Sequence, residues 1–368
     1  MFSMKSVTIK GVQYDLPIFL PDATRAVVKS TASRDVEIAG IKGAVVNTYH
    51  LMTTPGIDVL KEYNGIKNFM NFNGLIVSDS GGWQIFSLIY RDKKPGKITD
   101  EGVIFSSGGK NSKKILFSPE KSIQVQFAIG SDIIVCLDDF TNPSADDIEI
   151  KKSVDRTILW AKKCKQEFNR LVPDKKMTDS TRPLLMAVVQ GGFNKELRLE
   201  CFNRLDEIGF DAYGFGGYVV DEHGVNMEIS EYLASILPKN KIKFALGNGM
   251  PIEIAKMYKH GWNVFDCTLP TRDARNKRLY IFKKEPKSYD DLISKDTYDY
   301  VYINREKYVR DKTPVDNTCD CFTCKNYSKG YLNHLFKIED TSALRLATIH
   351  NMRTYSRLIS YISKFSNK

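Results

Sequence analysis

Short apolar runs recur along the chain, and each is followed by a polar or helix-length segment. In chain order they read AVVK (26–29), GAVVNTYH (43–50), LIVSDS (75–80), DIIVCLDD (132–139), LLMAVVQGG (184–192), AYGFGG (212–217), KFALGN (243–248) and VFDCTLP (264–270). Continuous apolar runs that alternate with helices, such as the one expected over 153–168, are typical of parallel strands joined by right-handed crossovers. We therefore predict an α/β fold, a (β/α)8 TIM barrel, as the simplest closure of eight such units.

Polar residues or glycines stand where the expected strands end. In chain order these are Asn47, Asp79, Asp138, Gln190, Gly216 with Gly217, Gly247 and Asp266. Barrel enzymes collect their chemistry at the C-terminal face of the strands. One such residue alone is more often an N-cap or a turn residue. The repetition at seven strand ends favours an active site at that face.

A compact group of metal-binding residue types follows the last expected strand. Cys319, Cys321 and Cys324 form a Cys-x-Cys-x2-Cys cluster, and His350 stands further along the chain. Three thiolates and one imidazole fill a tetrahedral Zn2+ site and leave no position for water, so we predict a structural zinc ion. The alternatives are a chance clustering and an iron–sulfur site, which usually has a fourth cysteine.

The pattern after Thr271 differs from that of the barrel, because charged and aromatic residues mix there before the cysteine cluster. Zinc would replace a hydrophobic core that so short a segment could not build. From residue 352 onward, apolar residues recur at helical spacing, which predicts a helix packed against the barrel. We expect a barrel with an N-terminal β extension over 1–272, a zinc-binding subdomain over 273–350 and the returning helix over 351–368.

The chain has 368 residues and a formal net charge of +10. Clustered Lys and Arg bind polyanions by releasing counterions from phosphates, although a generically Lys-rich protein would explain the charge equally well. The four remaining cysteines show no pairing pattern, which suits a reducing compartment. The N-terminus lacks the apolar core of a signal peptide, and no segment reaches about 18 apolar residues. We expect a cytoplasmic protein that does not bind a membrane.

Two of the strand-end residues, Asp79 and Asp266, are carboxylates followed by residues that shape a pocket. Paired carboxylates that face one cavity suit chemistry at a sugar carbon. One attacks or stabilises an oxocarbenium-like centre while the other transfers protons, as in retaining glycoside chemistry. Two unrelated strand-end caps are the alternative interpretation.

Several longer motifs resemble one family in order and in approximate spacing. They read NTYHLM, SDSGGWQ, VVQGG, GFGG, FDCTLPTRDARN and CDCFTCKNYSKGYLNHLF, followed by the pair His350 and Asn351. From about residue 31 to residue 359 the chain resembles the tRNA-guanine transglycosylases, also called queuine tRNA-ribosyltransferases, in their bacterial form.

The resemblance implies a pentosyltransferase that replaces guanine in tRNA, at wobble position 34, with a 7-deazaguanine base such as preQ1, in queuosine biosynthesis. Asp266 matches the nucleophile, which attacks C1′ of a guanosine and forms a covalent ribosyl-enzyme intermediate. Asp79 matches the general acid/base for the departing and incoming bases. The partner is the anticodon loop, from which the target base must be extracted.

The resemblance also implies a base pocket and an RNA-binding segment. The substrate-binding residues are Ser80, Trp83, Asp138, Gln190, Gly216, Gly217 and Leu246. Among them, Asp138 and Gln190 would hydrogen-bond the edge of the base, the glycine turn would present backbone N–H to its carbonyl, and Trp83 and Leu246 would stack on its faces. The RNA-binding residues are Arg272, Arg275 and Lys277. A homodimer is expected through surfaces near the zinc segment.

Some positions depart from the bacterial pattern. Val220 retains the bulk that goes with preQ1 in the family, but Tyr218, Phe140 and Trp83 differ from the usual residues and would reshape the pocket. The choice among preQ1, preQ0 and queuine therefore stays open. The alternative functions are a relative that acts on DNA or on another tRNA position, and a catalytically silent tRNA-binding subunit. The presence of both carboxylates argues against the silent subunit.

Overall fold

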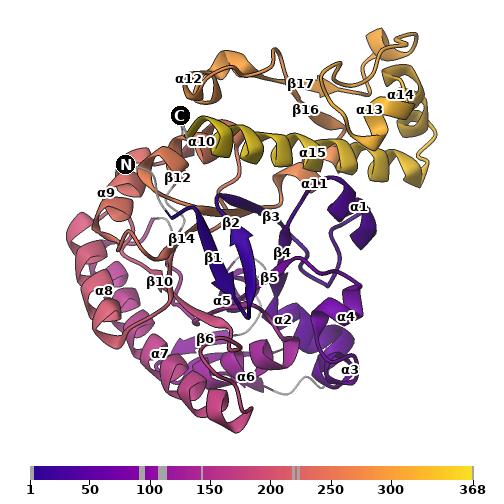
Figure 1. Cartoon of the computed structure of the whole chain (residues 1–368). Coiled ribbons are helices and arrows are strands. Elements are labelled where there is room, and N and C mark those ends of the chain that lie inside the picture. Colours follow the sequence, from indigo (N-terminus) through magenta and orange to yellow (C-terminus); the bar gives the residue numbers. More distant parts are fainter. Residues whose placement is uncertain are drawn as a thin grey trace.

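A computed structural model describes residues 4–90, 96–106, 114–141, 144–217, 220–221 and 224–366. Its centre is an eight-stranded parallel sheet that curls into a nearly closed barrel (Figure 1). In barrel order the strands are β3 (Ile18–Pro21), β15 (Val264–Cys267), β14 (Ile242–Ala245), β11 (Ala212–Phe215), β10 (Leu184–Val189), β9 (Ile133–Val135), β5 (Leu75–Asp79) and β4 (Gly43–Asn47). A parallel bridge between Asp22 and Val45 joins the two ends of the sheet. The predicted (β/α)8 barrel is confirmed.

Seven of the eight predicted strands are confirmed, and the first is wrong. The run AVVK does not form a strand, because residues 26–29 lie in the connection between β3 and α1 (Ser33–Ile38). Ala26 has a left-handed φ of 59° and Val27 is 43% exposed, so only part of this run enters the core. The first barrel strand is instead β3, whose four residues are all buried.

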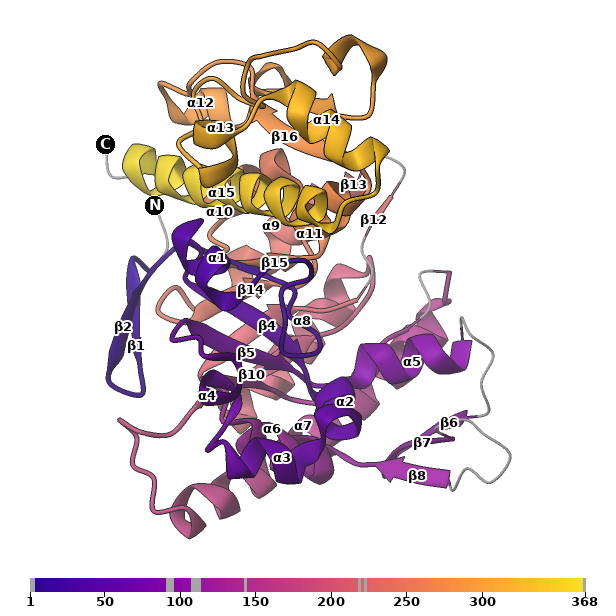
Figure 2. The same cartoon turned by 90° about the vertical axis from the view of Figure 1, so that its right-hand side faces the viewer.

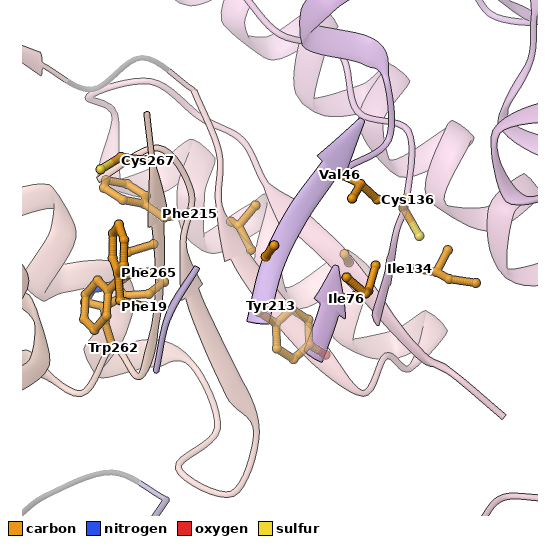
Figure 3. Packing of buried hydrophobic residues seen from close by; sticks show 14 of the residues in the cluster. Phe19, Val46, Ile76, Ile134, Cys136, Tyr213, Phe215, Trp262, Phe265 and Cys267 are labelled. Atoms are coloured by element: carbon orange, nitrogen blue, oxygen red, sulfur yellow. The ribbon is translucent and has the colours of Figure 1, made fainter. Parts of the chain in front are cut away.

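Side chains alternate between two core layers along each strand, because successive residues of a strand point to opposite faces. Ile18 and Leu20 of β3 fill the barrel interior, whereas Phe19 faces the helices outside. Figure 3 shows the outer layer, with Phe19, Val46, Ile76, Ile134, Tyr213, Phe215, Trp262 and Phe265 labelled. This alternation decides which strand-end side chains turn inward at the mouth of the barrel.

Helices cover the outside of the barrel. The main ones are α6 (Pro119–Ile129), α7 (Asp147–Asp174), α8 (Lys195–Ile208), α9 (Met227–Ile236) and α10 (Pro251–His260). Their boundaries follow local signals: Ser118 caps α6 by accepting a hydrogen bond from the N–H of Lys121, and Gly130 ends it in a left-handed conformation. Short helices α2 (Thr48–Leu51), α3 (Ile57–Glu62) and α4 (Ile66–Met70) connect β4 to β5.

Small β structures lie at the two ends of the barrel, as Figure 2 shows. The hairpin of β1 (Ser6–Ile9) and β2 (Val12–Asp15) covers one end, where Lys10 donates hydrogen bonds to the carbonyls of Gly130 and Ser131. At the opposite end, a sheet of β6 (Gly96–Thr99), β7 (Gly102–Ser106) and β8 (Lys114–Phe117) follows α5 (Gly82–Tyr90). This inserted sheet was not predicted from the sequence.

A subdomain follows the last barrel strand. It contains the antiparallel pair β16 (Arg278–Phe282) and β17 (Tyr298–Tyr302) and the short helices α12 (Tyr289–Leu292), α13 (Phe322–Asn326) and α14 (Lys329–Lys337). Helix α15 (Thr341–Ser366) runs along the base of this subdomain and packs on α11 (Leu269–Arg275) and β3 (Figures 1 and 2). Its residues Met352, Tyr355, Leu358 and Ile362 join the outer core of the barrel.

Within the described ranges, no helix combines the length and the apolar character that a membrane span requires.

Candidate functional site

Most of the predicted site residues lie at the carboxyl ends of the barrel strands. Asp79 is the last residue of β5, and Asp266 is the third residue of β15. Gln190, Gly216 and Leu246 directly follow β10, β11 and β14, and Asp138 lies three residues beyond the end of β9. Since the strands are parallel, these ends meet at one face of the barrel. The structure therefore brings the predicted catalytic and base-binding residues to a single mouth.

Asp79 is held by donors on both of its oxygens. Asn47 Nδ2 lies 2.9 Å from Oδ1 and 2.8 Å from Oδ2, the N–H of Gly81 donates to Oδ1 at 2.9 Å, and Gln84 Nε2 donates to Oδ2 at 3.0 Å. Burial nevertheless raises the pKa of Asp79 to about 6, because desolvation outweighs these donors. The carboxyl group can therefore both hold and release a proton near neutral pH.

Asp266 accepts fewer hydrogen bonds from the described residues than Asp79 does. The N–H of Gly247 donates to its Oδ1 at 2.7 Å. Burial, together with the negative charges of Asp22 and Asp79, raises the pKa of Asp266 to about 7. The side chain still has partial access to solvent through the mouth. A substrate can thus reach this carboxylate, which lies within electrostatic range of Asp79.

Asp138 and Gln190 lie together at the mouth of the barrel, and we call this pair the polar wall. Gln190 Nε2 donates to Oδ2 of Asp138 at 2.7 Å, and the hydroxyl of Ser80 donates a longer bond of 3.4 Å to Oδ1. Burial raises the pKa of Asp138 to about 6, opposed by Gln190 and reinforced by the charge of Asp139. Gln190 and Ser80 are almost fully buried. Together they offer fixed donors and acceptors to a flat polar edge.

The glycine turn after β11 lies close to this wall. A Cβ atom on Gly216 would lie 2.4 Å from Cγ1 of Val188 and 2.8 Å from Nε2 of Gln190, so no larger residue fits without displacing the amide. The N–H of Gly216 already donates to the carbonyl of Val189 at 3.1 Å. Gly217 has a left-handed φ of 83°, and no described residue accepts a hydrogen bond from its N–H.

Three aromatic rings cluster beside the mouth. The Trp83 indole stacks on Phe86 with ring centroids 5.9 Å apart and meets Phe140 edge-on at 4.5 Å. Trp83 is 46% exposed and Leu246 is partly buried, so both side chains remain accessible to a ligand. The sequence predicted a reshaped pocket at Tyr218, but this residue lies outside the described residues. The side chain of Val220 lies outside them as well.

Basic residues occupy the helix that follows Asp266. The side chain of Arg272 on α11 is 54% exposed and lies 3.8 Å from the carboxylate of Asp273. Among the described residues, Nη1 of Arg275 has no hydrogen-bond partner. Lys277 follows the helix with a left-handed φ of 65°. The guanidinium group of Arg272 is thus exposed on this helix, whereas Nη1 of Arg275 is buried.

The predicted metal ligands come together in the subdomain. Cys319, Cys321, Cys324 and His350 are buried, and their ligand atoms lie within 4.8 Å of one another. Nε2 of His350 lies 2.8 Å from the carbonyl oxygen of Tyr280, which orients Nδ1 toward Cys324 Sγ at 3.3 Å. This Cys3His group could hold a metal ion, and its donor set fits a soft, tetrahedral cation.

Tyr280 connects this group to the mouth of the barrel. Its carbonyl contacts His350, and its hydroxyl donates a hydrogen bond to Asp273, which lies between Arg272 and Arg275 on α11. The subdomain therefore fixes the position of the basic helix beside Asp266.

Two residues that support the site were not predicted. Gln84 binds Asp79 and belongs to the SDSGGWQ motif, which could have revealed it. Arg198 on α8 is completely buried, donates to the carbonyls of Val189 and Gly192, and lies 5.0 Å from the ring of Phe215. Nothing in its helix pattern distinguishes it from an exposed arginine. It braces the two turns that carry Gln190 and Gly216.

Comparison with known proteins identifies the family of the chain. The sequence model described as Queuine tRNA-ribosyltransferase matches residues 4–364. The chain belongs to this family. The Queuine tRNA-ribosyltransferase of Psychrobacter sp. (strain PRwf-1) is 36% identical over 97% of this chain and 88% of its own length, and that of Aliivibrio salmonicida is 37% identical over 95% and 86%. The resemblance inferred from the motifs and the expected class of enzyme, a pentosyltransferase, are confirmed.

Proposed function

We propose that this protein exchanges a guanine in tRNA for a 7-deazaguanine base at wobble position 34 of the anticodon loop, as a step of queuosine biosynthesis. One observation carries the proposal. In a chain of the Queuine tRNA-ribosyltransferase family, Asp79 and Asp266 end two barrel strands at one face, and the charge of Asp79 raises the pKa of Asp266. Two interacting carboxylates at one mouth suit a double displacement at a sugar carbon.

In the proposed reaction Asp266 is the nucleophile. Its carboxylate oxygen bonds to C1′ of the target guanosine, the C1′–N9 bond breaks, and the bonding electrons leave with guanine, which takes a proton from Asp79. The incoming base then gives its N9 proton to Asp79 and attacks C1′, which releases the Asp266 carboxylate. Each displacement inverts the configuration at C1′, so the product nucleoside has the same configuration at C1′ as the starting guanosine.

The polar wall is the proposed site for the base. The Asp138 carboxylate accepts from N–H groups of a guanine-like edge, while the amide of Gln190 and the N–H of Gly217 donate to its carbonyl. Trp83 and Leu246 would stack on the two faces, and a stacked base contributes on the order of 1–3 kcal/mol. The contact between Gln190 and Asp138 at 2.7 Å supports this assignment, because it fixes both groups before the base arrives.

The anticodon loop is the proposed polyanionic partner. Arg272, Arg275 and Lys277 would hold the nucleotides that flank the target, because guanidinium groups suit phosphates and exposed base edges. The exposed side chain of Arg272 supports this role. The net charge of +10 favours the same partner.

Zinc is the proposed metal, in a structural role. The Cys3His donor set would complete its four-coordinate shell and leave no site for water. Bound zinc would hold α13 against α15, so that Tyr280 and Asp273 keep α11 in place. We infer no chemical step at the metal.

We also propose a homodimer that works in the cytoplasm. An aromatic surface beside the Cys3His group supports the dimer: Tyr327 stacks on Tyr331 with centroids 5.4 Å apart, and Tyr331 and Phe322 are 46% and 41% exposed. The mass in solution, measured by light scattering, tests this: two chains per particle are expected.

The exchange reaction itself is the direct test. An anticodon stem-loop that carries labelled guanine at position 34 is incubated with preQ1, preQ0, queuine or unlabelled guanine. Release of label with wild-type protein, fastest with preQ1, is expected. Exchange into duplex DNA but not into the stem-loop would contradict the proposal and favour a DNA-modifying relative.

A further inference from the structure

A third carboxylate enters the mouth from the first barrel strand. Asp22 directly follows β3, which lies between β15 and β4 in the closed barrel. In the register of β3 and β15, Leu20 is the partner of Asp266. Leu20 points into the barrel, so Asp22, two residues further on, turns inward in the next layer toward the mouth. It therefore lies beside Asp266 on the side away from the base-binding wall.

The backbone around Asp22 is fixed to the barrel wall. Its own parallel bridge pairs it with Val45, the N–H of Ala23 donates to the carbonyl of Val45 at 2.7 Å, and the N–H of Asn47 donates to the carbonyl of Thr24 at 3.3 Å. Asn47 also binds Asp79. The Asp22 carboxylate thus has a defined position relative to both proposed catalytic groups.

Described residues contact one oxygen of the Asp22 carboxylate. Oδ1 accepts from the N–H of Thr24 at 3.1 Å and from the Thr24 hydroxyl, which locks the side-chain orientation. Across the part of the chain that the structure describes, no donor contacts Oδ2. The side chain is partly exposed. An anchored carboxylate with a free oxygen at the mouth is ready to accept a hydrogen bond from a ligand.

The position of Asp22 opposes the ionisation of its neighbours. Besides burial, its charge is among the causes that raise the pKa of Asp266 and of Asp79. A neutral residue would leave the nucleophile easier to ionise. A donor group of the substrate that binds Asp22 would give this carboxylate a role in the bound state.

The stereochemistry of a ribonucleoside suggests that role. The base projects from one face of the ribose ring, and the 2′- and 3′-hydroxyls project from the other. A nucleophile that displaces the base must attack from the hydroxyl face. A carboxylate beside Asp266 is consequently on the same face of the ring as the 2′-hydroxyl, the group adjacent to the reacting C1′.

We propose that Asp22 accepts a hydrogen bond from the ribose 2′-hydroxyl of the target nucleotide through Oδ2, and that it selects RNA over DNA. This inference rests on the proposed function. A hydrogen bond to the hydroxyl next to the anomeric carbon strengthens as positive charge develops there, so it acts on the rate of displacement. The 2′-hydroxyl is also the group by which a protein distinguishes the two nucleic acids.

The test compares two stem-loops that differ only in the sugar of nucleotide 34, which is ribose or 2′-deoxyribose. Single-turnover exchange is measured for wild type, Asp22→Ala and Asp22→Asn across a range of pH, and the two substrates are compared at the pH optimum of each variant. Wild type is expected to prefer ribose by about tenfold to a hundredfold, the range for a hydrogen bond to a charged group. Asp22→Ala should slow only the ribose substrate, and Asp22→Asn should keep part of the preference because its amide oxygen still accepts.

Asp58→Ala is the matched control, because Asp58 lies on α3 with a side chain 94% exposed, and it should retain the full preference. Thermal unfolding of each variant checks that it is folded. Equal slowing of both substrates in Asp22→Ala and Asp22→Asn, with the preference unchanged, would overturn the inference, as would equal wild-type rates on the two sugars. A wild-type protein that exchanges neither substrate would instead overturn the proposed function on which the inference rests.

Discussion

The N–H of Gly247 donates a 2.7 Å hydrogen bond to Oδ1 of Asp266, and it is the one hydrogen bond that the described residues give this carboxylate. Asp79, by contrast, accepts four. The difference explains why the pKa of Asp266 is raised to about 7 and that of Asp79 to about 6, since donors stabilise the anion. Asp266 thereby keeps one oxygen free for attack.

The pH dependence of guanine release should be bell-shaped. Asp266 must be ionised to attack, and Asp79 must be protonated to neutralise the leaving base. With pKa values of about 7 and about 6, the competent form is a minority species whose population is greatest between those values. We expect kcat/KM for the stem-loop to reach its maximum in that interval. A rate that keeps rising through alkaline pH would contradict the assignment of Asp79 as the acid.

Asp266→Asn should stabilise the fold above neutral pH. The pKa of Asp266 is raised in the folded protein, so its favourable contribution is complete below the unfolded value near 3.8 and is lost as pH rises through about 7. The amide cannot ionise and avoids that loss. At alkaline pH we expect the free energy of unfolding of the variant to exceed that of wild type by about 1–3 kcal/mol, a value reduced for the solvent that screens the charge at the mouth. At acidic pH we expect no difference. Urea unfolding at two pH values measures it; a constant difference would contradict burial as the cause.

Gln190→Leu should weaken base binding. The substitution removes the donor to Asp138 and leaves the carboxylate less stabilised, so the pKa of Asp138 should rise further. We expect KM for the incoming base to increase by at least about tenfold, because a buried polar edge would lose its partner. Gln124→Leu is the control, since Gln124 binds Glu167 on the outer helices at 2.8 Å. Equal effects of the two substitutions would place Gln190 outside the base pocket.

Cys321→Ser should release the metal and destabilise the subdomain. The Cys3His ligand atoms lie within 4.8 Å of one another, so the loss of one thiolate opens the coordination shell. We expect about one zinc per chain in wild type and a much lower content in the variant, by elemental analysis, with a lower melting temperature. Cys164→Ser, buried in α7, should keep its zinc. A zinc-free variant that is stable and active would refute a structural site.

The sequence predicted the barrel well because continuous apolar runs that alternate with helix-length segments are typical of buried parallel strands. It misplaced the first strand for a physical reason. Ile18–Pro21 is only four residues long and is bounded by two prolines, which are typical of turns, whereas residues 26–29 are apolar but lie in a connection. The inserted sheet β6–β8 was not predicted because its strands have four or five residues each and one apolar face at most.

The candidate site was predicted residue by residue, but its internal contacts were not. The strand ends and the motifs gave the two aspartates and the polar wall. The role of Arg198 depends on two backbone carbonyls from another element, and that of Asp22 depends on closure of the barrel between β3 and β4. Such contacts join residues far apart in sequence, so no local sequence pattern predicts them.

The most direct test of the central claim is to trap the covalent intermediate. Wild-type protein and a guanosine-34 stem-loop are incubated with a guanine analogue that binds the emptied base site, and the denatured mixture is analysed by gel electrophoresis and peptide mass spectrometry. The account predicts a protein–RNA adduct whose ribose is attached to Asp266, absent from Asp266→Asn and Asp266→Ala. An adduct of equal yield in those variants, or one attached to another residue, would contradict it.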